Sequence, residues 1–439
     1  MPEPNTPLAE RPWEDVERMV GVDEALARVL DAVAPLPTEE VPLLDALGLT
    51  LAESVVAEAD VPPFRNSAMD GYAVRAGDTA GAAFDRPIRL RVVGQIAAGQ
   101  PVELALDAGT AARIMTGASV PTGADAVVRF EETDEGSDGR AGPKESRRGT
   151  VAIHRAAKPG DNVREAGEDL RAGTTVLASG TRLRPAEIGL LAATNRATAP
   201  VHRRPRVAIL STGDEVVDVG PPLRPGQIRN SNGSTLAAMV RQWGAVPVPL
   251  GIARDTVEDL SEKLAAARDA DLIVTSGGVS LGDFDLVKDV LRAEGEVAIW
   301  QVRMKPGKPL AFGRVGGRPL LGLPGNPVAA AVSFFLFGRP AILKMLGRRD
   351  LTAPAVEATL LEPLDNRGQR RHYVRARLER RSDGTLTVRT AGEQGAGVLS
   401  SLGRANGLLV VPESLERAEP GMRLPVLLLD GEGDVPFSP

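Results

Sequence analysis

Short apolar runs alternate with longer segments of helical spacing between residues 206 and 346. Such alternation predicts a mainly parallel sheet with helices on both faces, so we assign an α/β domain to residues 205–349. The expected strands are 207–210, 246–250, 272–275, 297–302, 310–313 and 320–323, and the expected helices are 231–242, 256–268, 283–293 and 327–345.

The rest of the chain needs further domains, because 439 residues are too many for one core. Short strands separated by tight turns predict a small β-rich domain at 63–150 and a C-terminal β-barrel at 350–439. Residues 14–62 and 151–204 are assigned together to a discontinuous α+β lobe. The predicted fold class is therefore multidomain α/β plus β.

Composition removes several classes of function. The chain has no cysteine, which excludes disulfides, thiolate metal sites and cysteine nucleophiles, and its three histidines lie far apart. A formal charge of −6 argues against a general nucleic-acid surface. There is no run of about 18 apolar residues to span a membrane, and the first residues do not resemble a secretory signal. A cytoplasmic location is expected by default.

Four turns that follow apolar runs in the α/β domain concentrate glycines, acids and lysines. They are residues 211–215, 276–285, 305–309 and 323–327. Ligands bind at the carboxyl ends of strands in open α/β sheets. Glycines admit close backbone approach, lysines supply positive charge and carboxylates supply oxygen ligands for Mg²⁺. These turns therefore suit a phosphate-bearing ligand with a divalent cation.

The candidate residues in these turns also have ordinary structural explanations. Acids at a helix start are favoured by the helix dipole, Pro327 suits a first helical turn, and paired lysines are usually solvated. Lys305 and Lys308 interrupt an apolar stretch, which favours an oxyanion clamp. The candidate metal ligands are Asp214, Glu215, Asp283 and Asp285, and the candidate substrate-binding residues are Ser211, Thr212, Gly213, Asp214, Ser276, Gly277, Gly278, Ser280, Gly282, Pro324, Gly325, Asn326 and Pro327.

Two turns in the β-rich domain have a similar polar character. Residues 66–73 contain Asp70 before a strand, and residues 114–118 contain Thr116. Ordinary turn chemistry explains either turn alone. They could complete the pocket of residues 211–327 only if two domains or two subunits face each other.

At these residues the chain strongly resembles the molybdopterin molybdenumtransferase family, which includes MoeA and the E domain of gephyrin. The resemblance runs in order from about residue 20 to 430. The matching stretches are 62–64, 66–74, 114–121, 167–169, 211–215, 230–232, 276–282, 305–313, 323–327 and 400–412.

The resemblance implies an activity and partners. Family members insert molybdenum from molybdate into adenylated molybdopterin and release AMP, with Mg²⁺ assisting. They are homodimers of four-domain subunits whose cleft lies between the β-rich domain of one subunit and the α/β domain of the other. A molybdopterin adenylyltransferase is the expected partner. The implied catalytic residues are Asp70, Thr116, Glu215, Asp255, Asp285, Lys305 and Lys308, and Ser67, Met69, Gly117 and Arg370 join the substrate-binding set.

The chain departs from the family at two hydroxyl positions. Ala329 and Ala396 stand where the family often has Ser, and Arg370 could compensate for the lost oxyanion donors. The alternatives are a paralogue that prefers another oxyanion such as tungstate, a scaffold of the gephyrin E-domain type, and an adenylyltransferase. The persistence of Asp70, Glu215 and the two lysines favours an enzyme, and the flanking β domains favour the insertion step.

Overall fold

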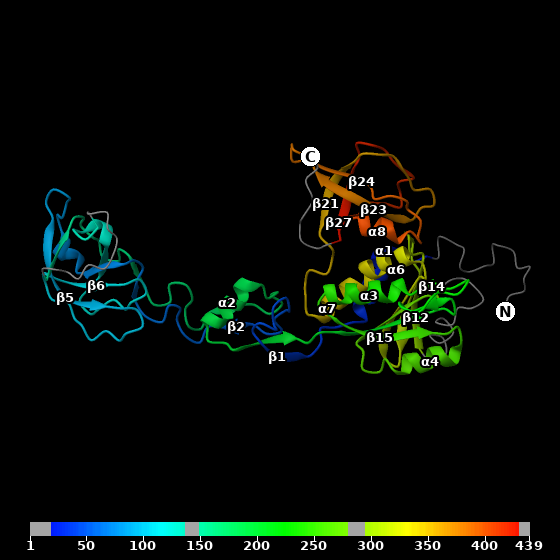
Figure 1. Ribbon diagram of the computed structural model, residues 1–439, viewed down its shortest axis with the longest axis horizontal. Helices are drawn as coiled ribbons and strands as arrows, with labels where there is room; N and C mark the ends of the chain where they lie inside the picture. The colour runs from blue at the N-terminus through cyan, green and yellow to red at the C-terminus, as the bar shows by residue number, and fades with distance from the viewer. Residues whose placement is uncertain (1–18, 137–148, 280–294, 430–439) are drawn as a thin grey trace, which may run out of the picture.

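The structure is a computed structural model that describes residues 19–136, 149–279 and 295–429. The molecule is elongated (Figure 1). A small β domain lies at one end of the long axis, a lobe containing α2 (Pro185–Ala193) lies in the middle, and the α/β domain lies at the other end beside the C-terminal barrel. The predicted multidomain α/β plus β fold is confirmed.

The central sheet of the α/β domain has the strand order β15-β12-β16-β20-β19-β17. The first four strands are parallel to one another, β19 pairs antiparallel with β20, and β17 pairs antiparallel with β19. The mainly parallel sheet is thus confirmed. The bounds are β12 Arg206–Thr212, β15 Val246–Ala253, β16 Leu272–Ser276, β17 Gly295–Gln301, β19 Pro309–Val315 and β20 Arg318–Leu323.

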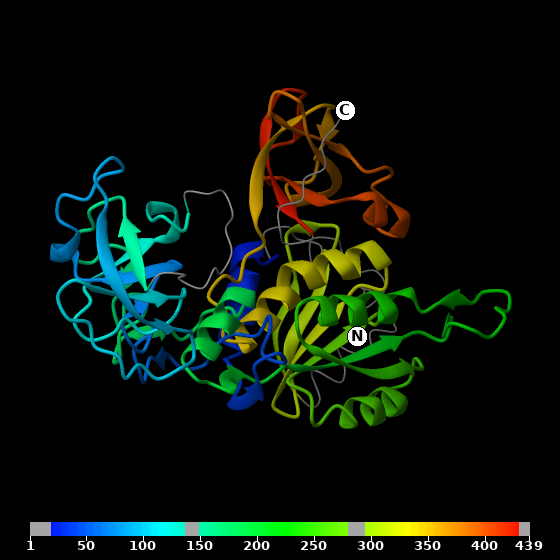
Figure 2. The same ribbon diagram turned by 60° about the vertical axis from the view of Figure 1, so that its left-hand side comes forward.

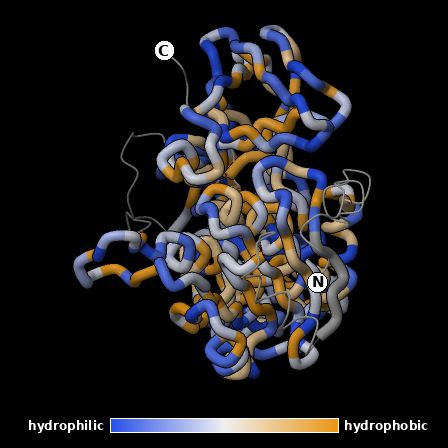
Figure 3. The backbone as a smooth tube through the Cα atoms, turned by 90° about the vertical axis from the view of Figure 1, so that its right-hand side faces the viewer, coloured by the Kyte–Doolittle hydropathy of each residue, from blue (hydrophilic) through white to orange (hydrophobic). Residues whose placement is uncertain are grey.

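Helices cover both faces of this sheet because alternate side chains of a strand point to opposite faces. Ile209 of β12 shares an apolar core with Leu236 of α3, whereas its neighbour Leu210 shares another core with Leu260 of α4. Hydrophobic segments gather inside the domain and hydrophilic segments lie mainly at its periphery (Figure 3). The two helices are α3 (Ser231–Gln242) and α4 (Val257–Ala265). The expected helix 283–293 lies outside the described residues.

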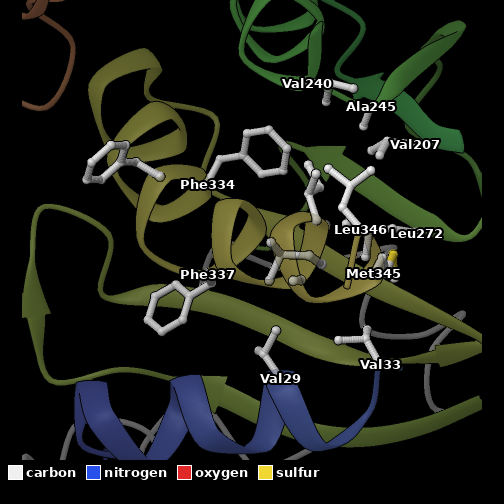
Figure 4. Packing of buried hydrophobic residues seen from close by; sticks show 14 of the residues in the cluster. Val29, Val33, Val207, Val240, Ala245, Leu272, Phe334, Phe337, Met345 and Leu346 are labelled. Carbon is white, nitrogen blue, oxygen red and sulfur yellow. The ribbon is translucent and has the colours of Figure 1, made fainter. Parts of the chain in front are cut away.

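The predicted helix at 327–345 is present as three consecutive segments. These are α6 (Pro327–Ser333), the π-helical η5 (Phe334–Gly338) and α7 (Arg339–Met345). Phe334, Phe337 and Met345 pack in the same core as Val29 and Val240 (Figure 4).

Pro327–Met345 is also the one helix of the described residues that is long and apolar enough to cross a membrane. The sequence analysis expected no such helix, because it found no run of about 18 apolar residues. However, 83% of its apolar window is buried inside the protein, as in the core helix of a globular domain.

Helix α1 (Val22–Asp31) comes from the segment assigned to the first lobe but packs on the α/β domain. Lys344 donates from Nζ to the carbonyl of Leu30 at 2.8 Å, and Arg314 donates to the carbonyl of Ala32 at 2.8 Å. The apolar spacing of α1 shows that one face is buried, but it does not specify the element that covers that face.

Chain segments before and after the small β domain build the middle lobe together. Strand β1 (Thr38–Pro42) pairs antiparallel with β11 (Thr198–His202), and β2 (Val55–Val56) pairs with β10 (Thr175–Leu177). Both pairs join residues more than a hundred positions apart in the sequence, so two separate chain segments form this lobe.

The small β domain contains a five-stranded sheet in the order β7-β4-β6-β5-β8. The sequence analysis placed the strand near residue 151 in the discontinuous lobe, but β8 pairs with β5 through Ile88 and Ile153. A short apolar strand carries no mark of its partner, so only the long-range pairing locates it. The bounds are β4 Gly71–Val74, β5 Ile88–Ile96, β6 Thr110–Ile114, β7 Ala126–Arg129 and β8 Thr150–Ile153, with η3 Ala76–Thr79, η4 Phe130–Glu132 and the pair β3 Asn66–Ser67 and β9 Val163–Arg164 alongside.

The C-terminal domain is a closed barrel, as predicted. Its order is β23-β24-β21-β27-β25, and β25 pairs again with β23 to close the ring. Strand β18 (Met304–Lys305) of the α/β domain joins β23 in parallel and links the two domains. The bounds are β21 Ala355–Leu360, β23 Arg371–Arg380, β24 Leu386–Thr390, β25 Gly407–Val411 and β27 Arg423–Leu428, with β22 Leu364–Asp365, β26 Arg417–Ala418 and α8 Leu399–Arg404 outside the ring.

Candidate active site

The loops that follow β12, β16 and β20 meet at the carboxyl edge of the central sheet and line a pocket of about 700 Å³. Pro309, from the predicted turn at 305–309, also lines this pocket. Of the sequence-predicted residues, the lining contains Ser211, Thr212, Gly213, Glu215, Asp255, Ser276, Gly277, Gly278, Pro324, Gly325, Asn326 and Pro327. Turns that are far apart in the sequence therefore form one site.

Gly277 shows why a glycine is needed in this lining. Its φ is +99°, and a Cβ there would lie 2.6 Å from Oγ1 and 2.8 Å from the carbonyl oxygen of Thr212. The absence of a side chain lets the loop after β16 lie directly against the end of β12. The pocket floor depends on this close approach.

The first turn of α3 connects three of the loops. Asn230 caps the helix, because its Oδ1 accepts from the amide of Gly233 at 2.9 Å and from Oγ of Ser211 at 2.8 Å. Asn232 donates from Nδ2 to Oγ of Ser276 and to the carbonyl of Gly325, both at 2.7 Å. The positive end of the α3 dipole thereby borders the pocket, where it suits an anion.

Glu215 and Asp255 line one side of the pocket, and Asp214, which is not among the lining residues, contacts Asp255. The amide of Asp255 donates to Oδ1 of Asp214 at 3.2 Å, and the amide of Asp214 donates to Oδ2 of Asp255 at 3.4 Å. Burial raises the pKa of Asp255 above its ordinary value; the Asp214 amide opposes this rise, and the negative charges of Asp214 and Glu215 add to it. The carboxylates are therefore close enough to repel one another.

This acidic group suits a cation that it shares with a ligand. Mg²⁺ is usually held by one or two carboxylates together with substrate phosphates, and a cation would relieve the repulsion that contributes to the raised pKa of Asp255. Within the described ranges, no three His, Asp or Glu side chains are arranged to hold a metal by themselves. The predicted residues Ser280, Gly282, Asp283 and Asp285 lie outside the described residues.

The two predicted lysines are not among the lining residues of the pocket. Lys305 pairs through the backbone with His372 of β23, and Lys308 directly precedes the lining residue Pro309. Burial lowers the pKa of His372 to about 3, with further lowering by the charges of Lys305, Arg375 and Arg370. Burial is the largest cause of the lowered pKa and the nearby positive charges add to it, so the imidazole is neutral at pH 7.

The C-terminal barrel supplies one wall through residues 392–398, which we call the barrel loop. Gly397 lines the pocket, and the carbonyl of Ala396 accepts from the amide of Val328 at 3.0 Å, at the start of α6. Sequence reasoning did not include Gly397 in the site, although the family resemblance had pointed to its neighbour Ala396.

A second polar group forms in the small β domain, where the two predicted turns meet. Oδ1 of Asp70 accepts from the amide of Thr116 at 2.7 Å and from its hydroxyl at 2.9 Å. The amide bond, followed by the hydroxyl bond, lowers the pKa of Asp70. The carbonyl of Ser67 accepts from the amide of Gly117 at 2.8 Å, and Asp70 and Met69 are exposed.

Within one chain, this second group and the pocket lie at opposite ends of the molecule (Figure 1). The middle lobe separates them. The segment that contains β13 (Val216–Val217) and β14 (Ile228–Arg229), which pair in parallel, also contributes to the pocket lining and projects outward from the α/β domain (Figure 2). Asp70 and Thr116 are therefore remote from Glu215 and Asp255 of their own chain.

Family profiles match the chain in three consecutive blocks. Residues 20–195 match the MoeA N-terminal region (domain I and II), residues 208–344 match a probable molybdopterin binding domain, and residues 357–429 match the MoeA C-terminal region (domain IV). A protein named molybdopterin molybdenumtransferase 2 from Mycobacterium tuberculosis is 43% identical over 408 residues, covering 91% of this chain and 96% of that protein. This chain belongs to the molybdopterin molybdenumtransferase family.

Other members of the molybdopterin molybdenumtransferase family agree over nearly the whole chain. The Bacillus subtilis protein of that name is 37% identical over 418 residues, covering 94% of this chain and 95% of its own length. Among solved structures, a MoeA protein of molybdopterin biosynthesis from Pyrococcus horikoshii has a TM-score of 0.79 at 33% identity, covering 95% of this chain and 100% of its own.

The family assignment gives a context to residues that sequence reasoning left out of the predicted site. Asn230 and Asn232 form an Asn-Ser-Asn pattern before an amphipathic segment, which is the signature of a helix cap. That signal was available in the sequence. Val279, Ile228 and Arg229 offered none, because their place in the lining depends on how the loops fold back.

Proposed function

We propose that this chain inserts molybdenum from molybdate into adenylated molybdopterin and releases AMP, the final step of molybdenum cofactor biosynthesis. The pocket at the strand ends carries the proposal. Its volume of about 700 Å³ lies in the range of ligand pockets, and its lining joins backbone-rich loops to an acidic side. The family membership of the chain supports the same reaction.

The loops after β12 and β16 are proposed to hold the phosphate-bearing part of the substrate. The absence of side chains at Gly213, Gly277 and Gly278 lets a ligand approach these loops closely, and the start of α3 adds a partial positive charge. Asn232 fixes these loops relative to each other through its bonds to Ser276 and Gly325. Binding of an adenylate at this edge thus needs little rearrangement.

Asp214 and Glu215 are proposed to hold Mg²⁺ together with the substrate, and Asp283 and Asp285 remain candidates for the same role. The ion would supply charge neutralisation for the phosphate oxygens when AMP leaves. The protein's part is to place oxygen ligands at the acidic side of the pocket, where Asp255 orients Asp214 by accepting from its amide.

Lys305, Lys308 and Arg370 are proposed to attract molybdate. The low pKa of His372, to which Lys305 and Arg370 contribute, supports a positive potential that suits an oxyanion. In this route a molybdate oxygen attacks the AMP phosphorus while the P–O bond to the molybdopterin phosphate breaks, and water then cleaves the Mo–O–P bond to release AMP. The site therefore needs to neutralise charge and need not supply a protein nucleophile. Because Ala329 and Ala396 carry no hydroxyl, the chain has two fewer potential oxyanion donors near this position.

The working unit is proposed to be a homodimer in which each cleft draws residues from both chains. Asp70 and Thr116 lie at the far end of their own chain (Figure 1), and a second copy would bring them to a pocket. Their exposure suits such a contact. Direct transfer of substrate from a molybdopterin adenylyltransferase is proposed as the supply step.

Purified protein incubated with adenylated molybdopterin, Mg²⁺ and molybdate tests the reaction. We expect AMP release that depends on molybdate, measured by chromatography, with loss of most activity in Glu215→Gln. AMP release that ignores molybdate would count against coupled insertion. The oxyanion preference is measured by replacing molybdate with tungstate at equal concentration and comparing the rates of AMP release. This comparison is needed because the hydroxyls of two family Ser positions are missing.

A further inference from the structure

Arg229 is a basic residue of the pocket that the proposed function has not yet used. Of the described residues that line the pocket, it is the only lysine or arginine, whereas Glu215 and Asp255 bring two carboxylates. Lys305 and Lys308 are not among the lining residues. A phosphate-bearing ligand is negatively charged, and a charge that leaves water needs a partner of opposite charge. The described lining therefore offers one basic side chain to such a ligand.

Strand pairing places Arg229 next to the positive end of α3. Arg229 lies opposite Val217 in the parallel pair of β14 with β13. The amide of the next residue, Asn230, donates to the carbonyl of Val217 at 2.9 Å, and Asn230 is the cap of α3. The charge of Arg229 and the partial positive charge of the helix start thus come from adjacent residues. Both favour an anion on this side of the pocket.

The guanidinium of Arg229 is bonded to neutral acceptors. Nη1 donates to the carbonyl of Asp218 at 2.7 Å, and Nη2 donates to the carbonyl of Pro221. No carboxylate of the described residues forms an ion pair with Arg229. A guanidinium has five N–H donors, so these two bonds leave further donors for a ligand. They also leave the positive charge without a negative partner.

The same two bonds order the side chain before a ligand arrives. Both acceptors belong to the segment of residues 216–229, which contains three prolines. At the base of this segment, the amide of Ile228 donates to the carbonyl of Glu215 at 2.8 Å. A free arginine side chain loses rotamer entropy on binding, and an ordered one loses less. Because Arg229 is only partly buried, a ligand in the pocket can reach it.

We propose that Arg229 is a substrate-binding residue that donates to the phosphate group of the adenylate in this pocket. Two carbonyls of its own segment hold the guanidinium, and its other N–H donors and its charge serve the phosphate oxygens. This role rests on the proposed function and adds a binding residue to the same pocket. It also offsets the repulsion that Glu215 and Asp255 exert on an anion.

Calorimetric titration of the full-length protein with AMP and with adenosine, both in the presence of Mg²⁺, tests this contact, because the two ligands differ only in the phosphate. We expect Arg229→Gln to weaken AMP binding by about ten- to a hundredfold and adenosine binding by less than about twofold, since hydrogen bonds between charged groups are the strong ones. Unchanged AMP affinity in Arg229→Gln would overturn the proposal. An equal loss of affinity for AMP and adenosine would also overturn it.

Arg224→Gln is the matched control, because it removes the same charge from the same segment. Arg224 is exposed and does not line the pocket, and the bond from its amide to Oε1 of Gln227 at 2.9 Å survives the substitution. AMP and adenosine should bind this variant as they bind the wild-type protein. A loss of AMP affinity as large as that in Arg229→Gln would indicate general electrostatic attraction and contradict a direct contact.

Arg229→Lys distinguishes the phosphate contact from support of the segment. A lysine keeps the charge but cannot reproduce the planar guanidinium that bonds both carbonyls, so we expect AMP affinity to fall by only about three- to tenfold, with adenosine binding unchanged. If the lysine and glutamine variants bind AMP equally weakly, the charge plays no part and the proposal fails.

The result for the wild-type protein distinguishes a failure of the proposed function from a failure of the role of Arg229. If the wild-type protein binds AMP and Arg229→Gln binds it equally well, only the role of Arg229 is wrong. If the wild-type protein binds neither AMP nor adenosine, the pocket is not a nucleotide site, and the proposed function fails together with the role of Arg229.

Discussion

His372 shows how one buried residue reports the charges around the proposed oxyanion site. Its ring is 5% exposed, and its pKa falls to about 3 through burial and through the positive charges of Lys305, Arg375 and Arg370. In the unfolded chain the imidazole titrates near 6.5. Below that pH the unfolded state binds a proton that the folded state refuses, so acid favours unfolding.

This difference predicts that the stability contribution of neutral His372 is fully present above pH 6.5 and is lost progressively as the pH falls toward 3. Between pH 6.5 and 5 the loss would reach up to about 2 kcal/mol. His372→Gln removes the titration and should flatten this part of the pH dependence. The measurement is the urea midpoint of barrel unfolding for both proteins at pH 7.5 and 5.0. An equal decline in both would contradict the assignment.

Asn232 provides a second prediction at the residue scale. Asn232→Ala removes the bonds that hold Ser276 and Gly325 together across the pocket. We expect AMP to bind about five- to tenfold more weakly, because the loops are no longer fixed before the ligand arrives. Ser234→Ala, an exposed change on the same helix, should leave calorimetric affinity at the wild-type value. Equal affinities for both variants would argue against preorganisation by Asn232.

At the scale of elements, the sequence predicted what local patterns control. Helix 231–242 and the strands β12, β16 and β20 follow from apolar spacing and caps, and the turns after them follow from glycines and acids. It could not predict the partner of β8, the docking of α1 on α7, or Gly397 in the pocket wall. Those depend on contacts between distant segments, which no local pattern encodes.

The turn after β16 supports a prediction that separates backbone strain from crowding. Gly277→Ala introduces a Cβ 2.6 Å from Thr212 at a positive φ, whereas Gly109→Ala has a φ of +75° and nothing within 4 Å. Both changes cost stability through φ, but only the first displaces the pocket loop. We expect AMP release to fall at least tenfold in Gly277→Ala and to remain near wild type in Gly109→Ala. Similar activity in the two would show that close approach is unimportant.

At the scale of the whole molecule, two groups of polar residues lie far apart within one chain. Asp70 and Thr116 hold a formed turn at one end of the chain, and the pocket with Glu215 lies at the other end (Figure 1). The middle lobe lies between them and is built from two chain segments that pair as β1 with β11. This lobe keeps the two ends of one chain apart. In the proposed homodimer, a second copy of the chain would bring Asp70 and Thr116 to this pocket.

Mixing two inactive variants tests this shared cleft most directly. Asp70→Ala and Glu215→Ala chains are each purified, mixed under conditions that exchange subunits, and assayed for molybdate-dependent AMP release. Random exchange makes about half of the dimers mixed, and each mixed dimer has one cleft with both native residues, so about a quarter of wild-type activity should return. Neither variant alone should recover on the same treatment. Proven subunit exchange without any return of activity would show that each chain works with its own Asp70, which contradicts the account.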